Sequence, residues 1–111
     1  MQILNSVYPT ATSTNTNAIV SGSILQAYNA MSVAFTVKNT GDTNSVDYQI
    51  IAGHTSNLSD GVVVQNTATL TQGTVGSYSV QVAAFSYYGV KIVSTSAGNH
   101  TTVSVLGRSK G

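Results

Sequence analysis

The sequence has no cysteine, no glutamate and no tryptophan, and only one of its 111 residues is proline. Without cysteine the chain can form no disulfide, and it offers no thiolate as a nucleophile or metal ligand. Only seven residues are formally charged and the net charge is +1, so the chain lacks the basic surface with which proteins bind nucleic acid. Its apolar runs are only a few residues long, which predicts no membrane-spanning segment. Glutamate is absent and leucine occurs only five times, and this scarcity of strong helix formers argues against a helical bundle.

Small polar residues and valine dominate the amino-acid composition. Ser, Thr, Asn and Gln account for 45 residues, and Val, Ser and Thr occur 15 times each. A chain of this length fits a single domain that buries one core without metal or disulfide. Because solubility normally rests on scattered charges, a neutral surface of Ser, Thr and Asn suits a protein that packs against neighbours. A neutral β domain without such neighbours is the alternative.

Apolar and polar side chains alternate along most of the chain, as in strands with one buried face. Turn residues such as those at 39–44, 59–61, 72–76 and 97–99 separate the alternating runs, a spacing typical of a β-sandwich or barrel. The expected strands, seven or eight in number with at most one short helical turn, cover 3–8, 19–28, 31–38, 46–52, 62–70, 78–84, 90–92 and 103–105. The expected core comprises Val33, Phe35, Val37, Tyr48, Ile50, Val80, Val82, Val90, Ile92, Val103 and Val105.

One segment, residues 10–17, has neither charge nor a large apolar group. Its composition is typical of a flexible linker or an extended arm, and an ordinary exposed loop is the alternative. A Thr-rich extended segment could lie along a neighbouring subunit by adding as a strand to an open sheet edge. We therefore divide the chain into an N-terminal strand and flexible arm, residues 1–17, and a β-sandwich domain, residues 18–111. No secretory signal is expected, because the first residues lack a basic region and a long apolar stretch.

The residues that carry chemistry are few and scattered. A metal site would have to draw on His54, His100 and three Asp, which show no ligand spacing. No Gly-x-Ser-x-Gly motif orients a serine nucleophile. Asp42 and Asp47 lie in a stretch that lacks the full spacing and terminal Glu of a calcium loop, so we expect Asp and Asn there to cap turns. The sequence thus predicts no enzyme, no metal and no cofactor.

Two features suggest contact with a partner. Tyr87 and Tyr88 could form a platform for a sugar, or one ring could lie in the core and the other at a sheet edge or interface. Arg108 and Lys110 place two of the four cations at the end of the chain, where they could dock on an acidic patch. With the arm, these features give the candidate partner-contact residues Thr10, Thr12, Ser13, Thr14, Asn15, Thr16, Asn17, Tyr87, Arg108 and Lys110.

Residues 33–41 end in V-x-N-T-G, and residues 46–50 read V-D-Y-x-I. Together these two segments resemble the strand-turn-strand of immunoglobulin-like virion modules. Residues 88–93 and 97–108 resemble the closing hairpin of the same modules in small structural proteins of tailed phages. The likeness covers about the last 80 residues. It implies an immunoglobulin-like antiparallel β-sandwich that acts as a head decoration (cement) protein, or as a related tail or fibre module.

The leading hypothesis is therefore a structural protein that binds the outer capsid surface of a virion and stabilises it. The resemblance implies the major capsid protein as partner and a homo-oligomer, with a trimer favoured. The lack of cysteine suits assembly in the host cytoplasm. The alternatives are a carbohydrate-binding or adhesive module of a phage tail, fibre or baseplate, a subunit of a cell-surface filament and, last, an enzyme. Neither nucleic acid nor membrane is expected as a partner.

Overall fold

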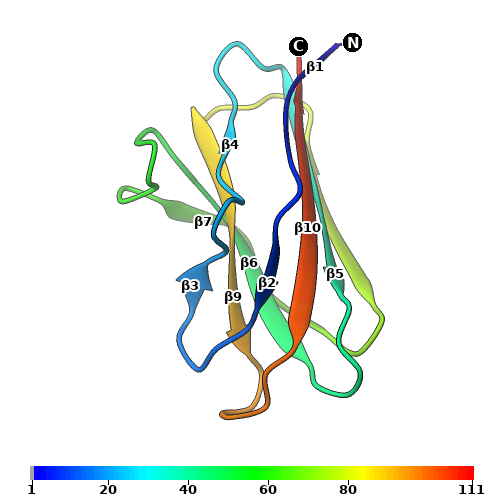
Figure 1. Cartoon of the computed structure of the whole chain (residues 1–111). Coiled ribbons are helices and arrows are strands. Elements are labelled where there is room, and N and C mark those ends of the chain that lie inside the picture. The colour runs from blue at the N-terminus through cyan, green and yellow to red at the C-terminus, as the bar shows by residue number, and fades with distance from the viewer. Residues whose placement is uncertain (1) are drawn as a thin grey trace.

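The computed structural model describes residues 2–111, which form ten β-strands and no helix (Figure 1). None of these residues belongs to a helix with the length and apolarity needed to cross a lipid bilayer. The strands are β1 Ile3–Val7, β2 Thr10–Thr12, β3 Ala18–Ile19, β4 Leu25–Gln26, β5 Ser32–Asn39, β6 Val46–Gly53, β7 Val62–Leu70, β8 Val75–Val80, β9 Tyr87–Ser94 and β10 Thr102–Lys110.

The strands form two antiparallel sheets that face each other. Sheet A has the order β1-β10-β5-β8, and β2 pairs with β10 beyond the end of β1. Sheet B has the order β3-β9-β6-β7, and β4 also pairs with β9. The N-terminal part of the chain, residues 2–28, therefore runs first along β10 and then along β9. It borders both sheets on one side of the molecule (Figure 1). This arrangement confirms the predicted all-β antiparallel sandwich.

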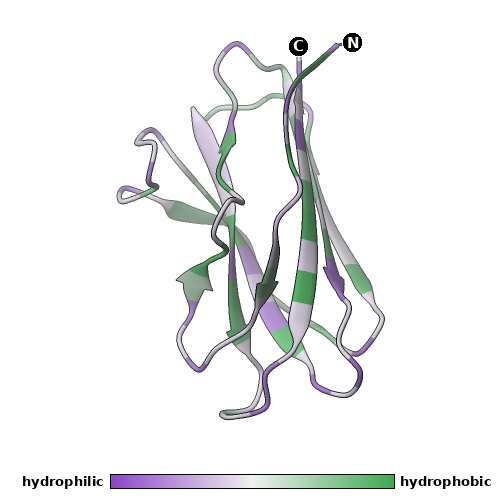
Figure 2. Cartoon of the chain, viewed as in Figure 1, coloured by the Kyte–Doolittle hydropathy of each residue, from purple (hydrophilic) through white to green (hydrophobic). Residues whose placement is uncertain are grey.

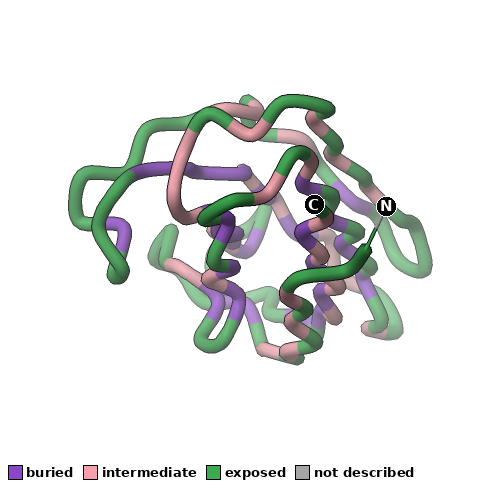
Figure 3. The backbone as a smooth tube through the Cα atoms, turned by 90° about the horizontal axis from the view of Figure 1, so that it is seen from above, coloured by how far each residue is buried: buried purple, intermediate pink, exposed green. Residues whose placement is uncertain are grey.

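The core lies between the sheets and follows the period of two. On β5, Val33, Phe35 and Val37 are buried while the residues between them are more exposed. Figure 2 shows the corresponding alternation of hydropathy along the strands, and Figure 3 shows the alternation of burial. Full burial of a Val, Leu, Ile or Phe side chain contributes about 1.5–3 kcal/mol, so the alternating face is the main source of stability.

One glycine is required by this packing. Gly107 on β10 pairs with Phe35 on β5, and a Cβ at position 107 would lie 2.6 Å from the Phe35 ring. A side chain there would collide with the ring or force it to move. The Phe35 ring is thus accommodated because the neighbouring strand has no side chain at this point.

The predicted core is correct at nine of its eleven positions. Val80 is only half-buried, and Val82 is wrong, because 76% of its surface is exposed. The alternation through 78–84 suggested a strand, but β8 begins at Val75, inside the predicted loop, and ends at Val80. Beyond Val80 the chain leaves the sheet, so a residue that continues the pattern in sequence no longer faces the other sheet. Buried residues outside the prediction include Val20, Leu25, Val46, Leu70 and Tyr88.

The strand count exceeds the predicted seven or eight because three strands have only two or three residues. The expected strand over 19–28 is two short strands, β3 and β4. Gly22 between them has a φ of +83°, a left-handed conformation that glycine adopts without steric cost. The chain bends at this point, and a continuous strand is therefore excluded.

Candidate partner-binding surface

The outward side of sheet A is a surface on which several of the predicted contact residues meet. Residues that pair directly in an antiparallel ladder point to the same side of the sheet, so the register identifies this side. Thr10 pairs with Ser104, and Ser104 pairs with Lys38. Arg108 pairs with Ala34, which pairs with Ser79. We call this surface the outer face of sheet A: Ser6, Thr10, Thr12, Ser32, Ala34, Thr36, Lys38, Val75, Ser77, Ser79, Thr102, Ser104, Leu106, Arg108 and Lys110.

Charge is segregated on this surface. Lys38, Arg108 and Lys110, three of the four cations, lie on the outer face of sheet A, and none of the strands of sheet A contains an acidic residue. Asp47 lies on β6 of sheet B, while Asp42 and Asp60 lie in loops. A protein with a net charge of only +1 therefore presents one clearly basic side. Thr10, Thr12, Arg108 and Lys110 from the predicted contact set meet there.

The guanidinium of Arg108 is held by an aromatic side chain rather than by a carboxylate. Its Nη2 donates a hydrogen bond to the Tyr8 hydroxyl at 3.1 Å, and Arg108 Cζ lies 6.0 Å from the centre of the Tyr8 ring. This hydrogen bond lowers the pKa of Tyr8. Arg108 Nε is buried and has no hydrogen-bond partner within residues 2–111. This nitrogen is therefore a donor that the described part of the chain leaves unsatisfied.

A hollow of about 240 Å³ lies beside these cations on the outer face. Its floor includes Ala34, whose small side chain lies in the row between Arg108 and Ser79. The residues around it are Ser32, Val33, Ala34, Ser79, Val80, Gln81, Arg108 and Lys110. Two cations and several small polar groups around one hollow suit a carboxylate or another small anionic group.

The arm predicted at the N-terminus lies on its own sandwich in the single chain. β1 and β2 pair with β10, and the exposed residues that follow, Thr14, Asn15, Thr16 and Asn17, are tethered at several points. Asn15 Oδ1 accepts a hydrogen bond from Gly98 N at 2.8 Å, and Asn17 Nδ2 donates to Gln49 Oε1 at 3.0 Å. These contacts join the segment to the β9–β10 loop and to β6.

Ser13 differs from the rest of the predicted contact set because only 1% of its surface is exposed. Its hydroxyl accepts a hydrogen bond from Thr101 N at 2.9 Å and lies 2.7 Å from Ser94 Oγ. Ser94 Oγ in turn lies 2.8 Å from His100 Nδ1. In this chain the Ser13 side chain is therefore used to fasten the N-terminal segment to β9 and β10, and it presents nothing to a partner.

Tyr87 lies on β9 in sheet B, apart from the outer face of sheet A. Its hydroxyl is 2.6 Å from that of Tyr28, the two rings meet edge to face, and the hydrogen bond raises the pKa of Tyr87. Tyr88 is 2% exposed, which confirms that one ring of the pair lies in the core. Near Tyr28 is a hollow of about 420 Å³ bordered by residues 27–30 and 83–86, including Phe85.

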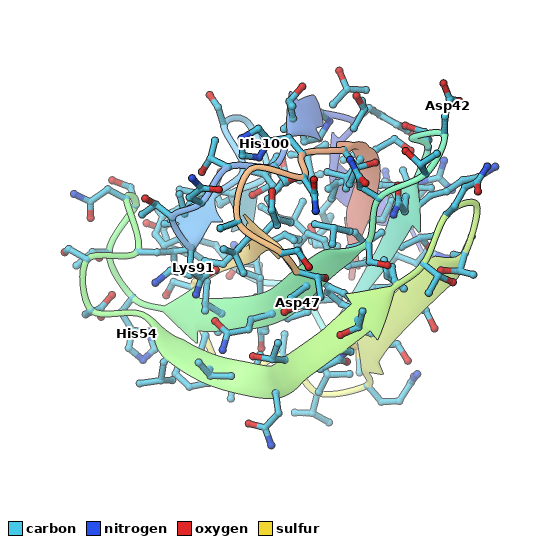
Figure 4. The ribbon with its side chains drawn as sticks, turned by 90° about the horizontal axis from the view of Figure 1, so that it is seen from below. Asp42, Asp47, His54, Lys91 and His100 are labelled. Atoms are coloured by element: carbon cyan, nitrogen blue, oxygen red, sulfur yellow. The ribbon has the colours of Figure 1, made fainter. Side chains whose placement is uncertain are left out.

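The candidate catalytic and metal-binding side chains do not converge. Figure 4 shows His54 and Asp42 on opposite sides of the molecule, with Asp47, Lys91 and His100 between them. Within residues 2–111 no three His, Asp, Glu or Cys side chains are placed to hold a metal ion. Asp60 accepts hydrogen bonds from His54 N, Thr55 N and Thr55 Oγ1, which hold the pKa of its carboxyl at about 2. Its role is to order the β6–β7 loop.

Sequence reasoning missed Lys38 and Tyr8. Lys38 occupies an outward position of the strongest alternating segment, so its side of the sheet could have been predicted. Lys38 shares a surface with Arg108 because β5 lies beside β10. This pairing joins strands that are distant in the sequence, so local patterns could not predict it. The contact between Tyr8 and Arg108 joins residues 100 positions apart and has no local signal.

The sequence matches no known protein family. No curated protein is similar to it in sequence. Solved structures with a similar fold include a chain from Bacillus endospore appendages, which form disulfide-linked pili (TM-score 0.55, 20% identity, 98% of this chain and 88% of that one). PirA is similar at a TM-score of 0.58 and 9% identity, over 92% and 94% of the two chains. A chain of the T13 particle of infectious bursal disease virus is similar at a TM-score of 0.51 and 11% identity, over 96% of this chain and 30% of that one. At these identities the likeness establishes the fold.

Proposed function

We propose that this chain is a non-enzymatic structural protein of a virus particle, which binds the outer surface of the capsid as a decoration protein and stabilises it. The observation that carries the proposal is the outer face of sheet A. It combines hydroxyl side chains, three cations and no acidic group on the flat side of a sandwich. Such a surface fits a protein partner with acidic side chains better than it fits a small substrate.

Each contact on this surface is weak alone. An exposed ion pair contributes about 0–1 kcal/mol, and a hydroxyl hydrogen bond contributes about as much. Strength in the proposed role comes from repetition, because copies linked to one another on a shell bind with avidity. The partner we propose is the major capsid protein, and the resemblance to phage modules favours a trimer as the repeated unit.

The fold comparisons support this class of function without specifying it. Proteins with this sandwich include a component of a viral particle and a pilus protein, both of which are parts of assemblies. The absence of cysteine fits assembly in the host cytoplasm, with the outer capsid surface as the final location.

Binding to capsids tests the proposal. Shells of the encoding virus that lack this chain are mixed with the purified protein and sedimented at several salt concentrations. The double variant Arg108→Ala/Lys110→Ala is expected to bind at least about tenfold more weakly, and wild-type binding should fall as salt rises. Lys91→Ala is the matched control, because Lys91 lies on sheet B. Absence of wild-type binding, or equal loss in the control, would reject this role for the face.

A second candidate function is carbohydrate binding. It is favoured by the exposed Tyr28 ring, paired with Tyr87, beside the hollow of about 420 Å³. Aromatic faces suit the apolar side of a sugar ring. A glycan array would support this function if a signal from the wild-type chain were lost in Tyr28→Ala. An array without signal would leave the capsid role as the better account.

A further inference from the structure

The sandwich has four sheet edges, and three of them carry features that oppose pairing with another chain. Natural edges are protected by very short strands, proline, bulges or charged residues. β3 and β4 have two residues each. The β1–β2 edge contains Pro9 and a register shift between Ile3 and Asn5. β7 has two register shifts in its pairing with β6.

β8, the fourth edge, has none of these features. It pairs with β5 over six consecutive residues without a register shift. It contains no charge and no proline, and the whole stretch 61–90 is uncharged. Val75 at its start is 54% exposed. β8 is therefore a regular, neutral and accessible edge strand, the kind that pairs readily with another strand.

The hydrogen bonds around β5 show which backbone groups of β8 are free to bond. Asn39 N donates to Thr74 O at 3.0 Å, on the β8 side, and Thr40 N donates to Thr102 O at 2.9 Å, on the β10 side. Hydrogen bonding alternates along an antiparallel strand, so the odd-numbered residues of β5 bond toward β8. Their register partners on β8 are the even-numbered residues Gly76, Tyr78 and Val80. The N–H and C=O groups that point outward belong to Val75, Ser77 and Ser79.

We propose that a second copy of this chain pairs with β8 through its own β8, in antiparallel orientation about a two-fold axis. With the axis at Ser77, Ser77 faces its own copy and Val75 faces Ser79 of the second molecule. Residues on the same side of the sheet then meet, as strand pairing requires. About six N–H···O=C bonds form, three donated by each copy. The two A sheets become one continuous sheet across the interface.

The occupant is a second copy because the edge is self-complementary and neutral. The residues that meet are uncharged, and none repels its counterpart. The nearest charge in sheet A is Lys38, one strand further in. Two such lysines would lie at least three strand spacings apart, about 14 Å, which exceeds the screening length of about 8 Å at physiological salt. In a trimeric assembly the same contact would join neighbouring trimers. The proposed pairing through β8 does not depend on the proposed docking to a capsid.

Analytical ultracentrifugation of the free protein tests the proposal. From about 10 µM to about 1 mM the wild-type chain should shift from monomer to dimer. Ser77→Pro removes an outward N–H and leaves the bonds to β5 in place, and Ser79→Lys adds a charge at the edge without changing the backbone. Both should weaken dimerisation at least about tenfold. Asn66→Lys on β7 is the matched control and should leave it unchanged.

Amide hydrogen exchange locates the contact. Exchange at Ser77 and Ser79 should slow as protein concentration rises, while exchange at Tyr78, already bonded to β5, should not. A wild-type chain that stays monomeric at about 1 mM would overturn the proposal. A dimer that neither Ser77→Pro nor Ser79→Lys weakens, or one without protection at Ser77, would overturn it as well.

Discussion

Asn39 is a buried polar residue whose replacement tests how the strand ends are held together. It ends β5 within the V-x-N-T-G stretch, and its side chain is fully buried. Its Nδ2 donates to Asn44 O at 2.8 Å and to Leu70 O at 3.0 Å. Its Oδ1 accepts from Gly41 N at 3.1 Å and from Thr101 Oγ1 at 2.8 Å. One amide thus joins the β5–β6 loop, the end of β7 and the last residue of the β9–β10 loop.

The expected cost of Asn39→Ala follows from what happens to these four partners. Gly41 and Asn44 are half-buried, so water can replace the lost bonds there at little cost. Leu70 and Thr101 are each 5% exposed, and their polar groups would be left buried without a partner. An unsatisfied buried group costs about 1–3 kcal/mol. We therefore expect the free energy of unfolding to fall by about 3 kcal/mol.

Urea denaturation followed by circular dichroism measures this loss. Thr101→Val and the double variant complete a cycle that isolates the bond between Asn39 and Thr101, for which we expect a coupling of about 1 kcal/mol. Thr36→Ala, on the outer face of sheet A, is the control and should change the stability by less than about 0.5 kcal/mol. A loss below about 1 kcal/mol for Asn39→Ala would show that the buried groups of Leu70 and Thr101 do not depend on the Asn39 amide.

Three further predictions concern the core, a loop and the N-terminal segment. Phe35→Ala should lower the free energy of unfolding by about 3–5 kcal/mol because a ring-sized cavity opens; a thermal melt showing almost no change would contradict this packing. The pKa of Asp60 is lowered to about 2 from 3.8, so its contribution to stability is present above about pH 4 and is lost as the pH falls through about 2. Asp60→Asn should therefore be clearly less stable than wild type at pH 6, and this difference should become much smaller by pH 2; a pH-independent difference would be inconsistent with this role. Removal of residues 1–17 should uncover the edge of β10 and cause more association than in the full chain at the same concentration, detectable by light scattering; a truncated chain that associates no more than the full chain would count against the N-terminal segment as an edge cover.

Local patterns in the sequence predicted the central strands well. The alternation at Val33, Phe35 and Val37 reports directly which side of β5 is buried, because side chains in a strand point to opposite faces in turn. The same rule failed at Val82, because a pattern cannot show where a strand leaves its sheet. Ends of strands are set by their partners, which lie elsewhere in the chain.

The candidate surface was predictable only in part. The cations of β10 could be assigned a common side from their spacing, but the neighbour of β10 could not. Ser13 illustrates the limit most clearly, since its burial depends on Ser94 and Thr101, more than 80 positions away. In a Thr- and Ser-rich segment the local sequence does not distinguish a hydroxyl that is bonded in the interior from one that is exposed to solvent.

Electron cryomicroscopy of shells incubated with the purified protein can show whether the outer face of sheet A seats this chain on a capsid. We expect density on the outside of the shell, with sheet A toward the capsid and Arg108 and Lys110 beside acidic side chains. Density that contacts the shell through sheet B, or that lies at the tail or inside the shell, would contradict this role of sheet A.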